Sequence, residues 1–190
     1  MSDKIRIFFD TEFIETPNHI ELISIGLLTD HSSCSNNADK LRDEDYYAVN
    51  KDADLSNASD WVHKNVLIEI PNYRSVGNYM KYGASKSEIV HDINHIVGKS
   101  FSVTPNIEFW ADFGSYDWVV FCGLFGRMVN LPGGYPMYVN DVQQLSRMVG
   151  CSHLDVDNNY DIHNALSDAK NCRDKYNFLR KTYEDAKIVF

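Results

Sequence analysis

Three apolar runs in the first third of the chain predict strands, and they span Lys4–Phe9, Ile20–Asp30 and Tyr46–Asn50. The segment Glu-Thr-Pro-Asn-His at positions 15–19 predicts a turn between the first two runs. Because each strand is joined directly to the next, the three favour an antiparallel meander. The polar stretch from Asp30 to Asp45 has almost no apolar content and predicts a surface loop.

Helical periodicity is clearest between Ser85 and Gly98. Ser85 and Glu88 have the spacing of a capping box at the start of this helix, and Gly98 stands at its end. Its apolar stripe consists of Ile89, Ile93, Ile96 and Val97. The other predicted elements are a short helix over 61–66, a strand over 106–111, a helix over 115–126, a strand over 135–140, a helix over 141–150 and a last helix that begins near Asn164.

The order of these elements indicates an α/β fold. Three strands and a helix are followed by alternating strands and helices, which fits a mixed sheet with helices on both faces. The strands after the meander are predicted to be parallel, because the intervening helices can serve as crossovers. The chain has 190 residues, of which 44% are hydrophobic and 24% are charged, so we expect one domain over residues 1–190.

Charge and composition narrow the possible partners. The formal net charge of -9 argues against a broad electrostatic grip on nucleic acid, but an acidic chain can act on phosphates if it first binds divalent cations. No apolar run approaches the roughly 20 residues of a membrane span, and the N-terminus leads into a strand instead of a signal peptide. We therefore expect no membrane partner and a cytoplasmic location. The widely spaced cysteines predict neither a disulfide framework nor a zinc site.

Asp10 and Glu12 directly follow the first apolar run, in the sequence Phe-Phe-Asp-Thr-Glu-Phe. Residues two apart in a strand point to the same face, so these carboxylates are predicted to project together from the end of the strand. Two carboxylates on one side repel each other unless they share a cation or a proton, and oxygen ligands of this kind suit Mg²⁺. Strand ends also carry solvated acids, so the pair alone is weak evidence.

Three further residues extend this pattern. Asp117 lies in the first turn of an apolar helix, and His163 and Asp168 flank the start of the last helix. Positions five apart lie roughly 140° apart on a helix, so His163 is predicted to lie in the loop just before the helix, with Asp168 pointing in from its second turn. Asp117 could instead be a helix N-cap or a partner of the helix dipole, His163 a hydrogen-bonded loop histidine, and Asp168 a surface acid on an amphipathic helix. Those separate roles would leave the combination of four acids and one histidine in this order unexplained.

These residues form three motifs, namely D-x-E at 10–12, Y-D at 116–117 and H-x4-D at 163–168. Together they resemble the 3′-to-5′ exonucleases of the ribonuclease-H-like superfamily, the DEDD group with histidine as the fifth member. The segments FFDTEFIE, IELISIG, WAD-x-GSYDWV and IHNALSDA are more closely similar to a small subfamily of actinobacterial and phage exoribonucleases. The resemblance extends from the first motif to the last, which is nearly the whole chain.

The resemblance implies a ribonuclease-H-like sheet and a role for each motif residue. The implied metal ligands are Asp10, Glu12, Asp117 and Asp168, and the implied general base is His163. Two features depart from the family pattern. Phe13 and Ile14 follow the first motif and change what touches the terminal nucleotide, and the loop from Asp30 to Asp45 is long for the subfamily.

The chemistry also follows from the residue types. Phosphodiester hydrolysis needs an activated water and a stabilised leaving oxygen, and two divalent ions such as Mg²⁺ or Mn²⁺, roughly 3.5 to 4 Å apart, supply both. In this interpretation Asp10 bridges the two ions, Glu12 and Asp168 hold the ion on the water side, and Asp117 supports the other. His163 is expected to take the proton from the attacking water.

Aromatic residues gather around the motifs, at Phe13, Trp110, Phe113, Tyr116 and Trp118. Nucleobases stack on such side chains largely independently of sequence. Most of these residues are expected in the core, because an aromatic content of 13% must be buried somewhere. Phe13, next to Glu12, is the predicted stacking residue, and Tyr116 is a second predicted substrate contact.

Three functions remain open on the sequence alone. The first is a metal-dependent 3′-5′ exoribonuclease acting on single-stranded or short RNA, and its preference for RNA rests on the resemblance. The second is a proofreading-type exodeoxyribonuclease with the same chemistry. The third is a nucleic-acid-binding module with a dead site, against which the intact set of five motif residues argues. Single-stranded nucleic acid is the expected partner, and the oligomeric state stays open, with a homodimer as one arrangement.

Overall fold

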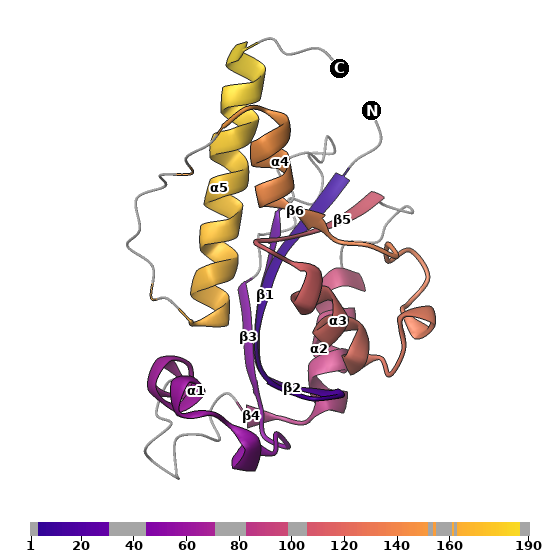
Figure 1. Ribbon diagram of the computed structural model, residues 1–190. Coiled ribbons are helices and arrows are strands. Elements are labelled where there is room, and N and C mark those ends of the chain that lie inside the picture. The colour runs from indigo at the N-terminus through magenta and orange to yellow at the C-terminus, as the bar shows by residue number, and fades with distance from the viewer. Residues whose placement is uncertain are drawn as a thin grey trace.

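The computed structural model describes residues 4–30, 45–70, 83–98, 106–151, 154, 161 and 163–186. A six-stranded sheet with the strand order β4-β3-β2-β1-β5-β6 forms its centre (Figure 1). The strands are β1 Lys4–Thr16, β2 His19–Asp30, β3 Asp45–Asn50, β4 Gly83–Ala84, β5 Asn106–Ala111 and β6 Asn140–Asp141. Apart from its two end residues, the predicted loop from Asp30 to Asp45 lies outside the described residues.

The sheet is mixed, as the sequence predicts. β1 pairs antiparallel with β2, and β2 pairs antiparallel with β3, which makes the meander. β4, β5 and β6 each join a neighbour in parallel, on β3, β1 and β5 respectively. β1 therefore has an antiparallel partner on one side and a parallel partner on the other.

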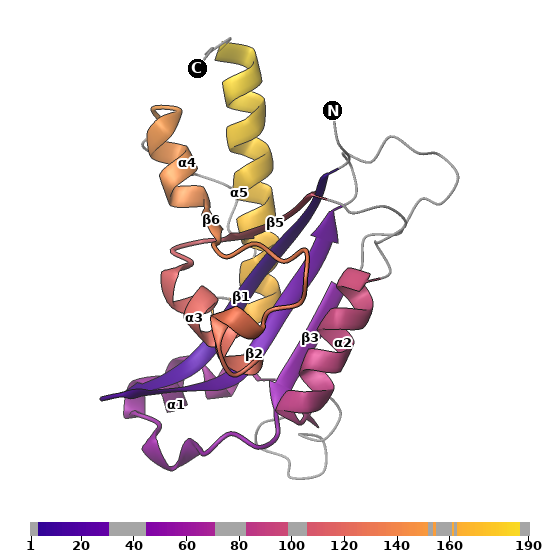
Figure 2. The same cartoon turned by 90° about the vertical axis from the view of Figure 1, so that its right-hand side faces the viewer.

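Helices cover both faces of this sheet, as predicted. They are α1 Asp60–Asn65, α2 Lys86–Gly98, α3 Ser115–Leu124, α4 Val142–Met148 and α5 Ala165–Ala186, with short 3-10 turns η1 Leu55–Asn57, η2 Leu67–Glu69 and η4 Met128–Asn130. α1 and α5 lie on one side of the sheet and α2 and α3 on the other (Figure 1). Figure 2 looks onto the face that α2 and α3 cover, with α5 behind the sheet.

Alternating residues of β1 build separate cores on the two faces. Ile7 and Phe9 point to the side of α2 and α3, where they join Ile89 and Phe121 in one buried cluster. Phe8 points to the opposite side, into a cluster contributed largely by α4 and α5. This period of two is the reason that Asp10 and Glu12, the next even positions, face α5.

Local sequence signals place the helix ends. In α2 the Ser85 backbone N–H donates to the Glu88 carboxylate at 2.7 Å, and the Glu88 N–H donates to the Ser85 hydroxyl oxygen at 3.3 Å, which confirms the predicted capping box. At the start of α5 the Asn164 side-chain oxygen accepts from the Ser167 N–H at 3.1 Å. The last helix therefore begins where the sequence predicts.

Two predictions about the strands are wrong. The first strand does not end near Phe9 but continues through both acids to Thr16, because β2 pairs with it over that whole length. Its register shifts between Glu12 and Phe13, where a bulge interrupts the ladder. The predicted strand over 135–140 shrinks to Asn140–Asp141, since Pro136 has no N–H to give to a sheet ladder.

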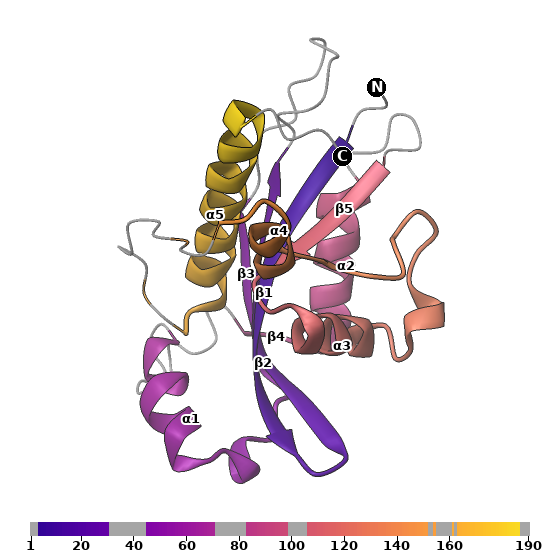
Figure 3. The ribbon, with the colours of Figure 1, turned by 45° about the horizontal axis from the view of Figure 1, so that its top comes forward.

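One strand has no counterpart in the sequence prediction. β4 consists of Gly83 and Ala84, which are too few and too small to give an apolar pattern. The β1–β2 hairpin reaches beyond the rest of the sheet, with α1 on one side and α3 on the other (Figure 3). Within the described part of the chain, no helix combines the length and the apolar character needed to cross a membrane.

Candidate active site

Three carboxylates from two distant parts of the chain meet on the face of the sheet that α5 covers. Asp10 and Glu12 come from β1, and Asp168 comes from the first turns of α5. One oxygen from each lies within 4.8 Å of the others. This spacing allows all three to reach one cation, and carboxylate oxygens are the donors that Mg²⁺ and Mn²⁺ prefer.

The close approach of α5 depends on Gly26 of β2, which is the pairing partner of Asp10. A Cβ atom at Gly26 would lie 2.2 Å from the backbone nitrogen of Leu166 and 2.3 Å from the carbonyl carbon of Ala165. Only a residue without a side chain leaves room for the first turn of α5 at this place. Gly26 therefore helps to set the separation between Asp10 and Asp168.

Asp117 reaches the site from the other direction, around the edge of β1. β5 pairs with β1 only as far as Phe8, so the following residues of β1 have no strand neighbour on that side among the described residues. The first turn of α3 takes its place, and the Oδ1 atom of Asp117 accepts from the backbone N–H of Thr11 at 2.9 Å and from its hydroxyl at 2.6 Å. These two bonds hold Asp117 beside Asp10, although it is not part of the group of three within 4.8 Å.

His163 lies in the turn before α5, as the helical geometry predicts. Its backbone has a φ of 65°, and its N–H donates to the Oδ2 atom of Asp168 at 2.9 Å. The imidazole ring meets the indole of Trp61 edge to face, with ring centroids 5.0 Å apart. Trp61 is the second residue of α1 and is 55% exposed, so this aromatic stands at the solvent side of the histidine.

The electrostatics of the site favour a bound proton or cation. Burial, together with the nearby carboxylates of Asp168 and Asp117, raises the pKa of Glu12 to about 8. Burial and the charge of Asp117 likewise raise the pKa of Asp10 well above its usual range. The pKa values of Asp117 and Asp168 are also raised, mainly by burial, against the opposing hydrogen bonds from Thr11 and His163. Such a cluster is costly when fully ionised, and a divalent cation would remove that cost.

A fifth acid, Asp112, stands behind this cluster. Its Oδ2 atom lies 2.6 Å from the Nζ atom of Lys175, and its Oδ1 atom accepts from the Gln143 side chain at 2.8 Å. Lys175 lies two turns after Asp168 on α5, so the ion pair ties α5 to the end of β5. We did not predict this pair, although an acid directly after a buried strand is a visible signal in the sequence.

The aromatic residues divide between the core and the surface. Trp118 is buried, and Trp110 packs on Tyr176 with ring centroids 4.6 Å apart, so these two belong to the core. Phe13 and Tyr116, the predicted substrate contacts, stack on each other at 5.9 Å with nearly parallel rings. Phe113 is the most exposed of the five, at 69%.

Trp61 was not among the predicted site residues, because nothing local connects position 61 with position 163. Its exposure is visible only in the structure, and the sequence favours burial for a large aromatic residue in a helix. Val62 and Val66 anchor that helix in a buried cluster with Ile14 of β1. Trp61 is thereby held on a fixed support over the site.

The fold is similar to that of 3′ exonucleases of known structure. The nuclease domain of 3′hExo, a DEDDh family member solved with bound rAMP, aligns with 95% of this chain and 93% of its own at a TM-score of 0.55 and 13% identity. A second structure, of a 3′-exonuclease in specific recognition of the 3′ end of a histone mRNA stem-loop, aligns with 95% of this chain and 83% of its own at a TM-score of 0.56 and 14% identity.

The family follows from the sequence match. Residues 5–179 match the 3′-5′ exoribonuclease Rv2179c-like domain, and the chain belongs to that family. The 3′-5′ exoribonuclease Rv2179c of Mycobacterium tuberculosis strain H37Rv is 32% identical over 178 residues, which cover 94% of this chain and 95% of that protein. The 3′-5′ exoribonuclease MT2234.1 of strain CDC 1551 matches with the same identity and coverage.

Proposed function

We propose that this chain is a divalent-metal-dependent 3′-5′ exoribonuclease that releases nucleotides from the 3′ end of single-stranded RNA, with residues 1–190 acting as one domain. The observation that carries the proposal is the convergence of Asp10, Glu12 and Asp168 within 4.8 Å, with Asp117 and His163 at its margin. Membership of the exoribonuclease family supports the reaction type. The relatives named for RNA support the choice of RNA over DNA.

In this proposal Asp10, Glu12 and Asp168 hold the metal ions, and Asp117 completes the set from the edge of β1. Two bound ions, Mg²⁺ or Mn²⁺, would supply an activated water and charge stabilisation for the leaving oxygen. Thr11 orients Asp117 through two hydrogen bonds, and the backbone N–H of His163 orients Asp168. The donor set fits the metals, because buried carboxylates with raised pKa values gain most from a cation.

His163 is the proposed general base. Its ring lies against Trp61 of α1, close enough to Asp168 to affect the pKa of that carboxyl, and in this proposal it accepts a proton from the attacking water. The positive φ at His163 places this residue in the turn before α5 and outside the regular helix. Tyr116 and Trp61, both about half exposed, are the proposed aromatic supports for the RNA bases.

Matched 5′-labelled RNA and DNA oligomers of one sequence test this function. We expect a ladder of RNA products shortened from the 3′ end in Mg²⁺ or Mn²⁺, slower cleavage of the DNA, and no products in EDTA. A blocked 3′ terminus should protect the RNA. Faster digestion of the DNA would contradict the RNA preference, and cleavage of a circular RNA would contradict the exonuclease assignment.

A further inference from the structure

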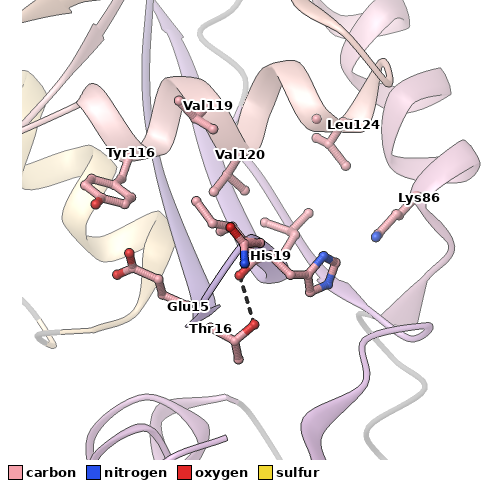
Figure 4. Close-up of a pocket in the computed structure, with 12 residues that line it drawn as sticks. Glu15, Thr16, His19, Lys86, Tyr116, Val119, Val120 and Leu124 are labelled. Atoms are coloured by element: carbon pink, nitrogen blue, oxygen red, sulfur yellow. Dashed lines mark hydrogen bonds between the residues drawn. The ribbon is translucent and has the colours of Figure 1, made fainter. Parts of the chain in front are cut away.

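A pocket of about 550 Å³ lies on the face of the sheet opposite α5, between α3 and the β1–β2 hairpin (Figure 4). Val119, Val120 and Leu124 of α3 point toward the hairpin and form one wall. Glu15 and Tyr116 stand at one end of the pocket, and Lys86 of α2 stands at the other (Figure 4). None of the five motif residues at the metal site lines it.

The pocket and the proposed active site lie on opposite faces of the sheet, and one aromatic pair beside the edge of β1, where Asp117 is held, lies between them. Tyr116, which lines the pocket, precedes Asp117 in the chain and stacks on Phe13, which follows Glu12. Glu15, also in the lining, is three residues beyond Glu12 in the same extended strand, which corresponds to about 10 Å. A strand of RNA whose 3′ end reaches the acids can therefore continue past Tyr116 into this space.

The chemistry of the lining suits a nucleobase and does not suit a phosphate. The ammonium group of Lys86 lies 3.1 Å from the Glu21 carboxylate, and the imidazole of His19 lies 3.0 Å from the same carboxylate, so both basic groups already face an acid. Glu15 adds a further acid at the rim. The apolar wall of α3 offers a surface for a flat ring. Glu15 can accept hydrogen bonds at its edge, and so can Thr16, whose hydroxyl donates to the His19 carbonyl oxygen.

We propose that this pocket binds the base of the nucleotide immediately upstream of the scissile bond. The inference rests on the proposed exonuclease function, because it assigns a subsite to the same substrate. The pocket is large enough for one base and its ribose, and the charged backbone would stay at the solvent side, away from Glu15 and Glu21. Contacts with the upstream base would then strengthen the binding of RNA beyond what the 3′-terminal nucleotide provides.

Gly123 gives a direct way to fill the pocket. It lies in the lining on α3, and a Cβ atom built there meets no other atom within 4 Å. Gly123→Leu therefore adds a side chain to the pocket lining, at a position where its Cβ atom has open space, and leucine is a good helix former. Val119→Phe fills the same space from the preceding turn of α3, where Val119 is 57% exposed. Gly133→Leu is the matched control, because Gly133 is equally unobstructed and lies outside the pocket.

Two substrates distinguish the loss of an upstream base contact from the loss of the hydrolysis step. One is a single-stranded RNA oligomer, and the other is the p-nitrophenyl ester of uridine 5′-monophosphate, which has no upstream nucleotide. We expect Gly123→Leu and Val119→Phe to raise KM for the RNA about tenfold, the scale of one lost base contact, while kcat changes little. The kcat/KM ratio of RNA to ester should fall by a similar factor. Gly133→Leu should keep the wild-type ratio.

The proposal is overturned if both pocket variants keep the wild-type KM for RNA, or if they lose activity equally on RNA and ester. The latter would mean that the substitutions disturb the acids and not an upstream contact. A wild-type protein that hydrolyses neither substrate in Mg²⁺ or Mn²⁺ would instead contradict the proposed function, so the two failures are distinguishable.

Discussion

At the scale of single residues, the site is defined by carboxylates that are unfavourable neighbours in the absence of a cation. Burial is the largest cause of the raised pKa values of Asp10 and Glu12, and repulsion from Asp117 and Asp168 adds to it at both. Hydrogen bonds counteract this cost only at Asp117 and Asp168 among the four acids. Asp10 and Glu12 therefore destabilise the metal-free fold when they are ionised, and the proposed function needs them as metal ligands.

Asp10→Asn and Asp168→Asn should lower activity without lowering the stability of the fold. We expect each to lower kcat by about 10²- to 10³-fold, because a charged metal ligand is lost. In EDTA each variant should melt at the wild-type temperature or above it, because a repulsive charge is removed. In Asp168→Asn the new amide oxygen can still accept from the His163 N–H. Steady-state kinetics and thermal melts measure the two effects.

Glu69→Gln, which changes an exposed acid on another element, serves as the control for these charge removals. Rates close to wild type in both Asp variants, with normal melting, would show that the carboxylates are not ligands.

His163→Asn is the sharper test of the proposed base. Asparagine tolerates the positive φ of this position and keeps the backbone N–H that orients Asp168, so the turn should survive. We expect kcat to fall by about 10²- to 10⁴-fold, the range of general base catalysis, while the affinity for Mn²⁺ stays near wild type. Single-turnover rates and Mn²⁺ titration give the two readouts. Undiminished turnover in the folded variant would remove His163 from the mechanism.

At the scale of elements, the site depends on how two helix N-termini approach β1. α5 closes over its face because Gly26 leaves space. α3 docks at its edge, where pairing with β5 ends at Phe8 and the Thr11 N–H donates to Asp117. Both contacts involve backbone, which is less able to adapt than a side chain. Small changes at these contacts should therefore displace the carboxylates that the two helices carry, Asp168 on α5 and Asp117 on α3.

Gly26→Ala is the corresponding test. The added methyl group would overlap the backbone of Ala165 and Leu166, so the start of α5 must shift together with Asp168. We expect a loss of about 1 to 3 kcal/mol in stability from overpacking, and a loss of about 10²-fold in kcat/KM from displaced ligands. Denaturant unfolding and kinetics at a temperature where the variant is folded measure these effects.

Gly133→Ala is the control for this change, because a Cβ atom there meets nothing within 4 Å. Wild-type activity in a folded Gly26→Ala protein would show that the separation of Asp10 from Asp168 does not depend on this glycine.

At the scale of the whole molecule, metal binding and stability should be linked through pH. In the metal-free protein Glu12 keeps its proton up to about pH 8, whereas in the unfolded chain it is lost near pH 4.5. Between these values the folded state binds more protons, so stability falls as the pH rises through this window. Divalent cations compete with those protons, so they should stabilise the protein more at high pH than at low pH.

Thermal melts at pH 6 and pH 8.5, in EDTA and in Mn²⁺, test this linkage. We expect the gain in melting temperature from Mn²⁺ to be larger at pH 8.5, and Glu12→Gln to reduce both the gain and the pH dependence in EDTA. The gain should be absent with a monovalent cation at equal ionic strength. An equal gain at the two pH values would contradict the linkage.

The sequence by itself determined most of the elements and the identity of the candidate ligands. Period-two and helical patterns depend on which face each residue buries, and that preference is encoded locally. The mixed sheet, the capping box of α2 and the position of His163 before α5 could therefore be predicted, and so could the shared direction of Asp10 and Glu12. The stacking of Phe13 on Tyr116 could not, although both residues were singled out.

Only the tertiary structure decided how these residues meet. The continuation of β1 to Thr16 depends on pairing with β2, the place of Asp117 depends on where β5 stops, and the separation of Asp10 from Asp168 depends on a glycine on a third element. Trp61 beside His163 and Lys175 beside Asp112 are contacts between segments far apart in the chain. Local patterns carry no information on such distances, because they result from close packing of the whole molecule and not from the preference of any one segment.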